Sequence, residues 1–457
     1  MKPNTTMGSQ SIGRLLWQFS WPSIVGMLSN ALYAVVDRVF VGQGVGSLAI
    51  AATTVAFPIM LILMAVAFLV GIGATALISI RLGEQKLEEA EKVAGNATAL
   101  LIILPLCLAA IYLLFPVPIL RAFGASSDVM PYALDFVHII MLGSVFGALG
   151  MGMNNFIRAE GNPVMAMSTQ VMGALINAVL NYFFIFKLGL GIKGSALATI
   201  LGQLFALIWV LSYFLGNRSL VKLRLKNFKL QRPIVMSIVS IGFAPFAMQL
   251  ANSVQQLILN KTVSSYGGDL GLSAVGILMS VITLSFMPIV GISQGAQPLI
   301  GFNYGARQFD RVKLTLKKAV IAASLVSSAS FLFFQFFPYQ IVGLFSKDNT
   351  ALTELTAHAM VVYFSMVFII GFQIICANYF QAVGKGAKAT VLSLSRQVLL
   401  LIPLILILPR FWGIEGVWRT APIADALASL ITGLFIYYEM KYLPEPLVLP
   451  ELREQPD

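Results

Sequence analysis

Apolar segments of about 20 residues or more, each long enough to cross a lipid bilayer, recur from one end of this chain to the other. Of its 457 residues, 58% are hydrophobic and only 11% are charged. A soluble protein of this size needs more charged surface than such a composition supplies. The sequence also lacks the ten-residue alternation of a transmembrane β-barrel. It therefore predicts an all-α polytopic membrane protein.

Twelve of these segments are predicted to be transmembrane helices. They are residues 15–40, 48–80, 93–115, 130–157, 163–186, 192–215, 233–260, 270–303, 318–337, 351–382, 387–410 and 414–440. Several of them exceed thirty residues and must tilt, bend or extend beyond the bilayer. Kinks are predicted at Pro22, Pro58, Pro245 and Pro288.

The distribution of Lys and Arg predicts the orientation. With the N-terminus in the cytoplasm, 22 of the 30 Lys and Arg residues lie in cytoplasmic segments and 8 lie in outer segments. This bias follows the positive-inside rule, so both termini are predicted to be cytoplasmic. Topology and contact with anionic lipid account for the net charge of +11, and nucleic-acid binding is not predicted. The short termini and compact loops favour a prokaryotic inner (plasma) membrane.

The two halves of the chain repeat one another. The segment "GATALISIRLGEQK" (73–86) aligns with "GAQPLIGFNYGARQ" (295–308). At the same offset, to within one position, "RAEG" (158–161) aligns with "QAVG" (381–384) and "GIKG" (191–194) with "GIEG" (413–416). Matches in such a near-constant register along the whole chain indicate a duplicated six-span unit.

Four regions follow from this register. They are an N-lobe (1–215), a basic linker (216–232) that we expect to be solvated in the cytoplasm, a C-lobe (233–443) and a cytoplasmic tail (444–457). Both lobes begin in the cytoplasm, so they are predicted to be related by a pseudo-twofold axis along the membrane normal. Transporters use such duplication to build a cavity between two lobes that rock about it.

The sequence offers little support for other classes of membrane protein. It has no nucleotide-binding fingerprint, metal-ligand cluster or nucleophile triad, so neither ATP-driven pumping nor enzymatic catalysis is predicted. No cofactor is expected. A selectivity filter rich in glycine or a ring of acidic residues is also missing, which argues against a channel.

Several motifs resemble those of the multidrug and toxic compound extrusion (MATE) family. They are "SWPSIVGMLSNALYAVVDRVFVGQ" (20–43), "GIGATALISIRLG" (71–83), "RAEGNP" (158–163), "NAVLN" (177–181), "GIKGSALAT" (191–199) and "GISQGAQPLIGFNYGA" (291–306). The resemblance implies a secondary antiporter that expels bulky, often cationic and amphipathic drug-like compounds by alternating access, driven by H⁺ or Na⁺. The branch it most resembles is the DinF-like one, in which a carboxylate of the first span is central. A monomer is expected.

By this resemblance, the cation-coupling site of the first lobe consists of Asp37, Asn177, Asn181 and Thr199. Some members carry a second aspartate where this chain has Asn181. A single carboxylate accommodates a proton or one monovalent cation, which favours H⁺ and leaves Na⁺ as the alternative. A bare carboxylate at the bilayer centre costs roughly 2.5–3.5 kcal/mol. The other interpretation of Asp37 is therefore an ion pair with the neighbouring Arg38 near the outer interface.

Two further sets of residues are candidates for binding. A polar site in the second lobe is predicted from Gln256, Asn260, Asn378 and Asp425, of which Asn260 is the duplicate of Asp37 in the repeat. Contacts with substrate in the cavity are predicted for Tyr33, Asn154, Met172 and Met151. Arg396 is expected near the inner end of its span, with its side chain extended to the interface.

The main rival function is that of a flippase for a lipid-linked saccharide, from a related superfamily with similar lobes. Such a protein is expected to have a strongly basic central cavity that binds a pyrophosphate, and often fourteen spans. Here the intramembrane basic residues are few and lie towards the ends of the spans.

Overall fold

The computed structural model describes residues 6–216, 218–345 and 350–443, which form helices and no β-strand. The helices of residues 6–216 are α1 (Thr6–Ser9), α2 (Ile12–Gly44), α3 (Ser47–Gly83), α4 (Leu87–Leu114), α5 (Pro116–Ala122), α6 (Met130–Leu142), α7 (Ser144–Ala159), α8 (Pro163–Tyr182), the π-helical η1 (Phe183–Lys187) and α9 (Gly191–Leu215). The remaining helices are the 3₁₀-helical η2 (Leu225–Phe228), α10 (Arg232–Gly305), α11 (Phe309–Phe336), α12 (Pro338–Gly343), α13 (Thr350–Tyr363), the 3₁₀-helical η3 (Val367–Ile369), α14 (Ile370–Ala382), α15 (Gly386–Leu394), the π-helical η4 (Ser395–Leu401), α16 (Ile402–Ile407) and α17 (Pro409–Lys441).

These helices account for the twelve predicted spans. Nine described helices are long and apolar enough to cross a membrane, or eleven if each of two bent pairs is one span. The bent pairs are α6 with α7, at 52°, and α13 with α14, at 44°. At 1.5 Å per residue, the 74 residues of α10 are far longer than a bilayer is thick. Gly268, with a φ of 56°, divides α10 into two spans, which gives twelve.

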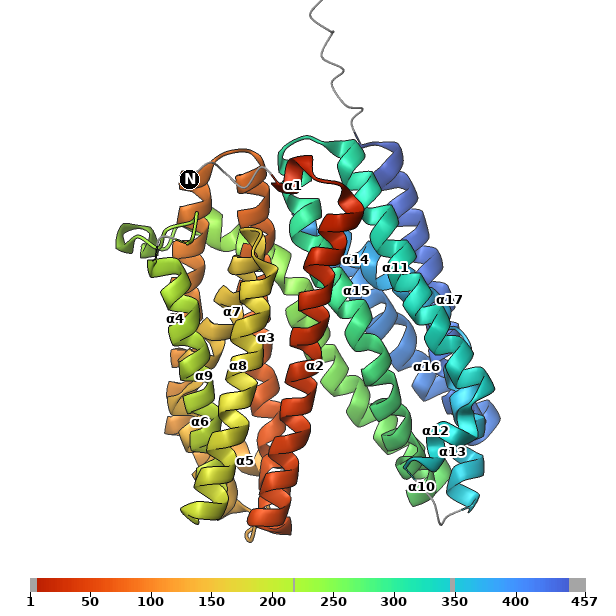
Figure 1. Cartoon of the computed structure of the whole chain (residues 1–457). Helices are drawn as coiled ribbons and strands as arrows, with labels where there is room; N and C mark the ends of the chain where they lie inside the picture. The colour runs from red at the N-terminus through yellow and green to blue at the C-terminus, as the bar shows by residue number, and fades with distance from the viewer. Residues whose placement is uncertain (1–5, 217, 346–349, 444–457) are drawn as a thin grey trace, which may run out of the picture.

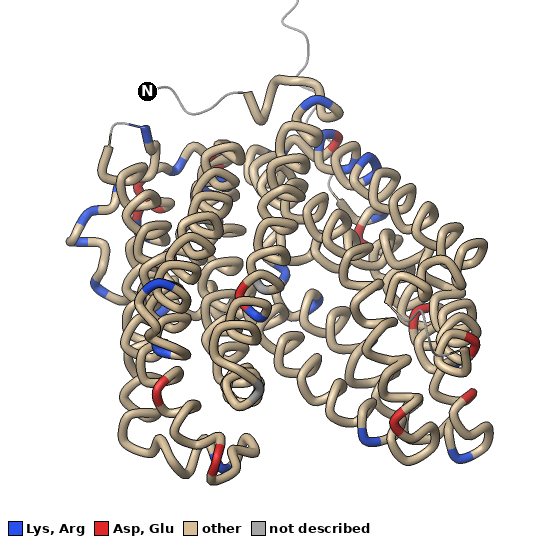
Figure 2. Tube along the Cα trace, turned by 60° about the horizontal axis from the view of Figure 1, so that its bottom comes forward, with Lys and Arg blue, Asp and Glu red and all other residues tan. Residues whose placement is uncertain are grey.

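Figure 1 shows the spans arranged as two bundles side by side, with α3 to α9 in one and α10 to α17 in the other. α1 and the last turn of α17 lie at the same end of the molecule. Figure 2 shows that most of the chain is uncharged and that Lys and Arg gather towards this end. The positive-inside rule predicts that it faces the cytoplasm. We call it the inner end below.

The backbone repeats with the sequence, which supports the pseudo-twofold relation of the two lobes. Residues with a positive φ recur at equivalent positions of the two halves even where they are not glycine. The pairs are Gly46 and Gly268, Gln85 and Arg307, Gly161 and Gly384, and Gly191 and Gly413. The short helices α5 and α12, which the sequence did not predict, also begin at equivalent positions, Pro116 and Pro338. The two halves therefore share their turns as well as their spans.

The lobes meet at the inner end through a symmetric pair of glycines. Gly83 ends α3 and its duplicate Gly305 ends α10. A Cβ added at Gly83 would lie 2.0 Å from the carbonyl oxygen of Phe302, and one added at Gly305 would lie 2.1 Å from that of Ile80. Each helix end thus packs directly on the backbone of the other lobe, which only a residue without a side chain permits.

A second duplicated pair extends this contact towards the middle of the membrane. A Cβ at Gly73 would lie 2.2 Å from the carbonyl oxygen of Ile238 in α10. At the duplicate, Gly295, it would lie 2.7 Å from the backbone nitrogen of Ser20 in α2. Both pairs lie in the inner half of their spans. The interface between the lobes is therefore closed on the inner side.

We call the contact that Gly83, Gly305, Gly73 and Gly295 make between the lobes the seal. Replacing Gly305 by Val is expected to open it. The nearest obstacle is the backbone of Ile80, which cannot move aside as a side chain does, and overpacking of this kind costs about 1–3 kcal/mol. The population of the inner-closed state should fall relative to the open one by roughly 5- to 150-fold. We expect faster thiol labelling of Ser79→Cys, a buried position in α3, in a background without Cys107 and Cys376.

Gly276→Val is the matched control, because it lies on the same helix and an added Cβ there meets no atom within 4 Å. It should leave the labelling rate of Ser79→Cys unchanged. Equal labelling rates for Gly305→Val and the control would contradict the assignment of this contact as the seal.

The basic linker between the two lobes is fixed to the first lobe by hydrogen bonds. Glu160, which follows α7, is buried, and its carboxylate accepts hydrogen bonds from four donors of α9 and the linker. These are Tyr213 Oη (2.8 Å), Ser219 Oγ (2.7 Å), Leu220 N (3.1 Å) and Val221 N (3.1 Å). Burial raises the pKa of Glu160 above its ordinary value, and the donors oppose this shift. These hydrogen bonds anchor the linker backbone, while basic side chains such as Lys222, Lys226 and Lys229 are exposed, as expected of a solvated linker.

The second half of the linker is fixed by Asn96 of α4. Its side-chain amide donates to the carbonyl oxygen of Asn227 (3.0 Å) and accepts from the backbone N–H of Gln231 (2.7 Å). Arg224 pairs with the buried Glu91 at 2.8 Å. The sequence did not predict these anchors, because Glu91 and Asn96 lie far along the chain from their partners in the linker.

Candidate functional site

The side chain of Asp37 lies in the outer part of α2, where it faces polar groups of α8 and α9. Its Oδ1 accepts hydrogen bonds from Asn181 Nδ2 at 2.8 Å and from Ser195 Oγ at 3.1 Å. Both donors are uncharged, and both are buried. The carboxylate is therefore positioned by neutral partners from two other helices.

A chain of hydrogen bonds continues from Asp37 towards the middle of the lobe. Asn181 Nδ2 also donates to Asn177 Oδ1 (3.0 Å), and Asn177 Nδ2 donates to Thr199 Oγ1 (3.5 Å). The hydroxyl of Tyr33 lies 3.3 Å from Thr199 Oγ1. The structure thus brings together all four residues predicted for cation coupling. Their role in coupling stays a prediction.

Three helices each contribute two residues to this cluster at a spacing of i, i+4, which places both on one helix face. The pairs are Tyr33 and Asp37 of α2, Asn177 and Asn181 of α8, and Ser195 and Thr199 of α9. Ser195 was not predicted as a partner of Asp37, and Tyr33 was predicted to contact substrate in the cavity. Ser195 precedes Thr199 by one helical turn, and that spacing was the signal available for it.

The alternative interpretation of Asp37, an ion pair with Arg38, is not what the structure shows. Among the described residues, no carboxylate lies within 4 Å of the Arg38 guanidinium. Instead, the guanidinium carbon of Arg38 lies 5.9 Å from the centre of the Phe57 ring. The two neighbouring side chains therefore point to different surroundings, as adjacent residues on a helix do.

One oxygen in the cluster lacks a donor. Both N–H groups of the Asn181 amide are used, by Asp37 and Asn177, while its Oδ1 is buried and has no hydrogen-bond partner in the described part of the chain. A buried acceptor without a partner is unfavourable by about 1–3 kcal/mol. A proton carried by the carboxyl, or a small cation that takes oxygen ligands, would satisfy this oxygen, so the residues present fit either coupling ion.

The four residues predicted for a second-lobe site do not form one cluster. Gln256 donates to Asn260 at 3.1 Å on an exposed part of α10. Asn378 donates to Ser293 Oγ at 2.5 Å. Asp425 is 2% exposed and accepts from another residue altogether. These polar residues of the second lobe are therefore distributed over three separate contacts.

The partner of Asp425 is Arg396, whose Nε lies 2.5 Å from Asp425 Oδ1. The expectation that Arg396 extends to the interface is therefore wrong. Arg396 lies in the π-helical η4, and its neighbour Gln397 donates to Asn252 Oδ1 (2.6 Å) and to Gln255. The second lobe thus contains an ion pair between the buried Asp425 and the half-buried Arg396, with a network of amides beside it.

The predicted substrate contacts have other partners in this state. The amide of Asn154 is buried and donates to the Ala166 carbonyl oxygen (2.8 Å) and to Thr169 Oγ1. Its Oδ1 accepts from Arg158 Nη2 (3.0 Å), so no polar group of Asn154 is left for a ligand. Met151 packs on the core of the first lobe, and Met172 is half-buried in α8.

The buried Arg158 connects the two lobes. Besides Asn154, its guanidinium donates to Gln294 in the second half of α10. Gln294 lies next to Gly295, one of the glycines of the seal. Polar side chains also cross the interface at the inner end, where Arg311 and Asn303 donate to the carbonyl oxygen of Met7 in α1, at 2.9 Å and 3.3 Å.

Comparison with known proteins identifies the family to which this chain belongs. The MatE family model matches residues 22–183 and 245–407, one match in each half of the chain. The Multidrug export protein MepA of Staphylococcus haemolyticus (strain JCSC1435) is 26% identical over 431 residues, which cover 94% of each chain. The same protein from Staphylococcus aureus (strain N315) is 26% identical over 424 residues, or 93% of each chain.

A solved structure shares the whole fold. The crystal structure of MATE in complex with MaL6 superposes with a TM-score of 0.91 at 24% identity, and covers 97% of this chain and 99% of that one. The family match spans both repeats, in the register seen in the sequence and in the backbone. This multi-pass membrane protein of twelve spans is therefore a member of the MATE family.

Proposed function

We propose that this protein is a secondary active multidrug antiporter, which exports amphipathic, cationic organic compounds in exchange for H⁺ or Na⁺. The observation that carries the proposal is Asp37, a carboxylate of a membrane-spanning helix that is held by two uncharged side chains. The curated relatives named above are multidrug export proteins. The proposed setting is the inner membrane, with a monomer whose termini are both cytoplasmic.

The carboxylate is suited to couple an ion to a change of conformation. A buried charge is unfavourable without a counter-ion, and a bound H⁺ or Na⁺ neutralises it. Ion binding also changes which hydrogen bonds the cluster makes, because a protonated carboxyl becomes a donor. The ion can then favour one state of the lobe over another, which is the free-energy difference that coupling requires.

α2 connects this cluster to the seal between the lobes. Its outer part carries Asp37, whereas its inner part packs on the second lobe, with Ser20 against Gly295 and Ile24 against Gly291. Pro22 lies inside this continuous helix, between Ser20 and Ile24, and its missing backbone N–H supplies a place where the helix can bend. α2 can therefore transmit a change in the hydrogen bonds of Asp37 along one continuous helix to the interface that must open.

The proposal is tested in proteoliposomes with ethidium as the transported cation. A pH gradient and a Na⁺ gradient are imposed in separate experiments, and dye accumulation is followed by fluorescence. We expect accumulation with at least one gradient and its collapse when an ionophore dissipates that gradient. Equal dye distribution under both gradients would contradict secondary antiport, and movement of a lipid-linked saccharide instead would favour the flippase.

A further inference from the structure

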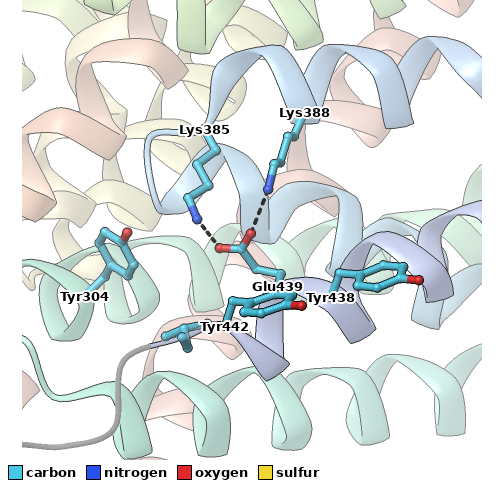
Figure 3. Close-up of a pocket in the computed structure, with 7 residues that line it drawn as sticks. Tyr304, Lys385, Lys388, Tyr438, Glu439 and Tyr442 are labelled. Carbon is cyan, nitrogen blue, oxygen red and sulfur yellow. Dashed lines mark hydrogen bonds and ion pairs between the residues drawn. The ribbon is translucent and has the colours of Figure 1, made fainter.

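A pocket of about 200 Å³ lies at the inner end of the second lobe, away from the Asp37 cluster. Figure 3 shows that it is bounded by the ends of three helices, α10, α15 and α17. The lining residues are Tyr304, Lys385, Lys388, Tyr438, Glu439, Tyr442 and Leu443. The proposed antiport mechanism uses none of them.

The charges around this pocket do not balance. Glu439 is 6% exposed, and its two oxygens accept from Lys385 and, at 3.0 Å, from Lys388. Among the described residues that line the pocket, two ammonium groups thus share one carboxylate, which leaves a net charge of +1. Each ammonium has three N–H donors, and each uses only one of them on Glu439.

The start of α15 adds to this positive potential. Lys385 occupies the N-cap position, without a side-chain capping hydrogen bond, and Lys388 is the third residue of the helix. The N-terminus of a helix already carries a partial positive charge and has free backbone N–H groups. Cations are therefore unfavourable at this position, and Glu439 neutralises only one of the two lysine charges. An additional anion would complete the balance.

The size and surroundings of the pocket limit what this anion is. Drug-sized ligands occupy about 300–1,000 Å³, so the pocket is too small for a multidrug substrate. Tyr438 and Tyr442 are 56% and 73% exposed beside it. Exposed tyrosines next to lysines at the end of a span are typical of the membrane–water interface, where the cytoplasmic leaflet supplies anionic headgroups.

We propose that this pocket binds a singly charged phosphate group, the phosphodiester of an anionic phospholipid in the inner leaflet. One negative charge matches the net charge of the pocket. The free N–H donors of Lys385 and Lys388 would contact the phosphate oxygens, and the tyrosine rings would flank the glycerol. Free inorganic phosphate has the same binding chemistry but lacks the acyl chains that hold a headgroup at the interface.

The full-length protein in detergent is mixed with phosphatidylglycerol, with phosphatidylcholine or with inorganic phosphate, and bound molecules are measured by native mass spectrometry. The wild type should retain phosphatidylglycerol in preference to phosphatidylcholine. Each lysine near an anionic lipid raises the affinity for that lipid about fivefold. The double variant Lys385→Gln with Lys388→Gln should therefore lower the affinity for phosphatidylglycerol by roughly 30-fold. Retention of phosphate alone would assign the site to the free anion and contradict the lipid.

Glu439→Gln gives the sharper test, because a structural ion pair and an anion site predict opposite results. Removing the carboxylate frees both lysines, so an anion site binds phosphatidylglycerol more tightly. Lys441→Gln is the matched control. It removes a lysine of the same helix end that lies over the Tyr442 ring, at 5.8 Å, and is not part of the lining.

Circular dichroism and gel filtration confirm that each variant is folded. Unchanged lipid retention in the double lysine variant, or weaker retention in Glu439→Gln than in the wild type, would overturn the proposal. A loss in Lys441→Gln as large as that in the double variant would do so too, because it would show general charge attraction instead of a site.

Discussion

Replacing Asp37 by Asn is expected to reduce gradient-driven dye efflux from cells to the level of cells without the transporter. Asparagine keeps the size of the side chain and an oxygen that accepts from Asn181 and Ser195. It cannot bind and release a proton, and it provides no negative charge for Na⁺. The variant should therefore fold and insert normally while it loses coupling. Ethidium efflux, normalised to the amount of protein in the membrane, measures this effect.

Asp135→Asn serves as the control for this experiment. Asp135 is a carboxylate of the same lobe, but it is partly exposed in α6 and pairs with Lys193 at 3.3 Å. Such a pair contributes about 0–1 kcal/mol to stability, and its loss should leave efflux near the wild-type rate. Wild-type efflux by Asp37→Asn would instead make Asp37 a structural residue of the helix bundle.

Replacing Asp425 by Asn is expected to destabilise the protein by about 3 kcal/mol, because it leaves the half-buried Arg396 guanidinium, 25% exposed, without its counter-ion. This is a large part of the typical stability of a folded domain, about 5–15 kcal/mol. The second lobe should unfold at a much lower denaturant concentration. Unfolding in a mixed-micelle titration with dodecyl sulfate, followed by tryptophan fluorescence, measures the change.

Removing both charges separates a structural pair from a coupling group. The double variant Arg396→Met with Asp425→Asn leaves no uncompensated charge, so it should recover most of the lost stability. Glu415→Gln, which breaks an exposed pair with His358, is the control and should change stability by less than about 1 kcal/mol. A double variant no more stable than Asp425→Asn would show that the pair is not what stabilises this region.

The spans, the duplication and the symmetric contacts between the lobes follow from periodic features of the sequence. The alignment of residues 73–86 with 295–308 already pairs Gly83 with Gly305. What it does not reveal is that each of these glycines packs on the backbone of the helix that ends in the other. A repeat fixes which positions are equivalent, but the contact between them depends on how the two lobes are placed.

The candidate site was predictable where it depends on the face of a regular helix, as for Asn177 and Asn181. The Arg396–Asp425 pair depends instead on η4, where the π-helix adds a residue to the turn and rotates the following side chains. Gln255, and not the predicted Gln256, joins the network beside this pair. Such one-residue differences reverse which side chain is buried, and local sequence does not determine them.

The anchors of the linker show a further limit. The six basic residues of the loop predict a solvated segment, and their side chains are exposed, but composition does not predict where the backbone is anchored. The buried acceptors that fix it, Glu160 and Asn96, lie after α7 and on α4, far away in the sequence. Their role becomes visible only when the donors of the linker backbone are located in the fold.

The most direct test of ion coupling by Asp37 compares gradient-driven accumulation with gradient-free exchange in proteoliposomes that contain Asp37→Asn. Accumulation requires the coupling ion to bind and leave, whereas exchange of labelled for unlabelled ethidium requires only that the lobes alternate with substrate bound. We predict that the variant loses accumulation under a pH or Na⁺ gradient and keeps dye exchange near the wild-type rate. Accumulation at the wild-type rate would contradict the central claim that Asp37 couples the ion gradient to transport.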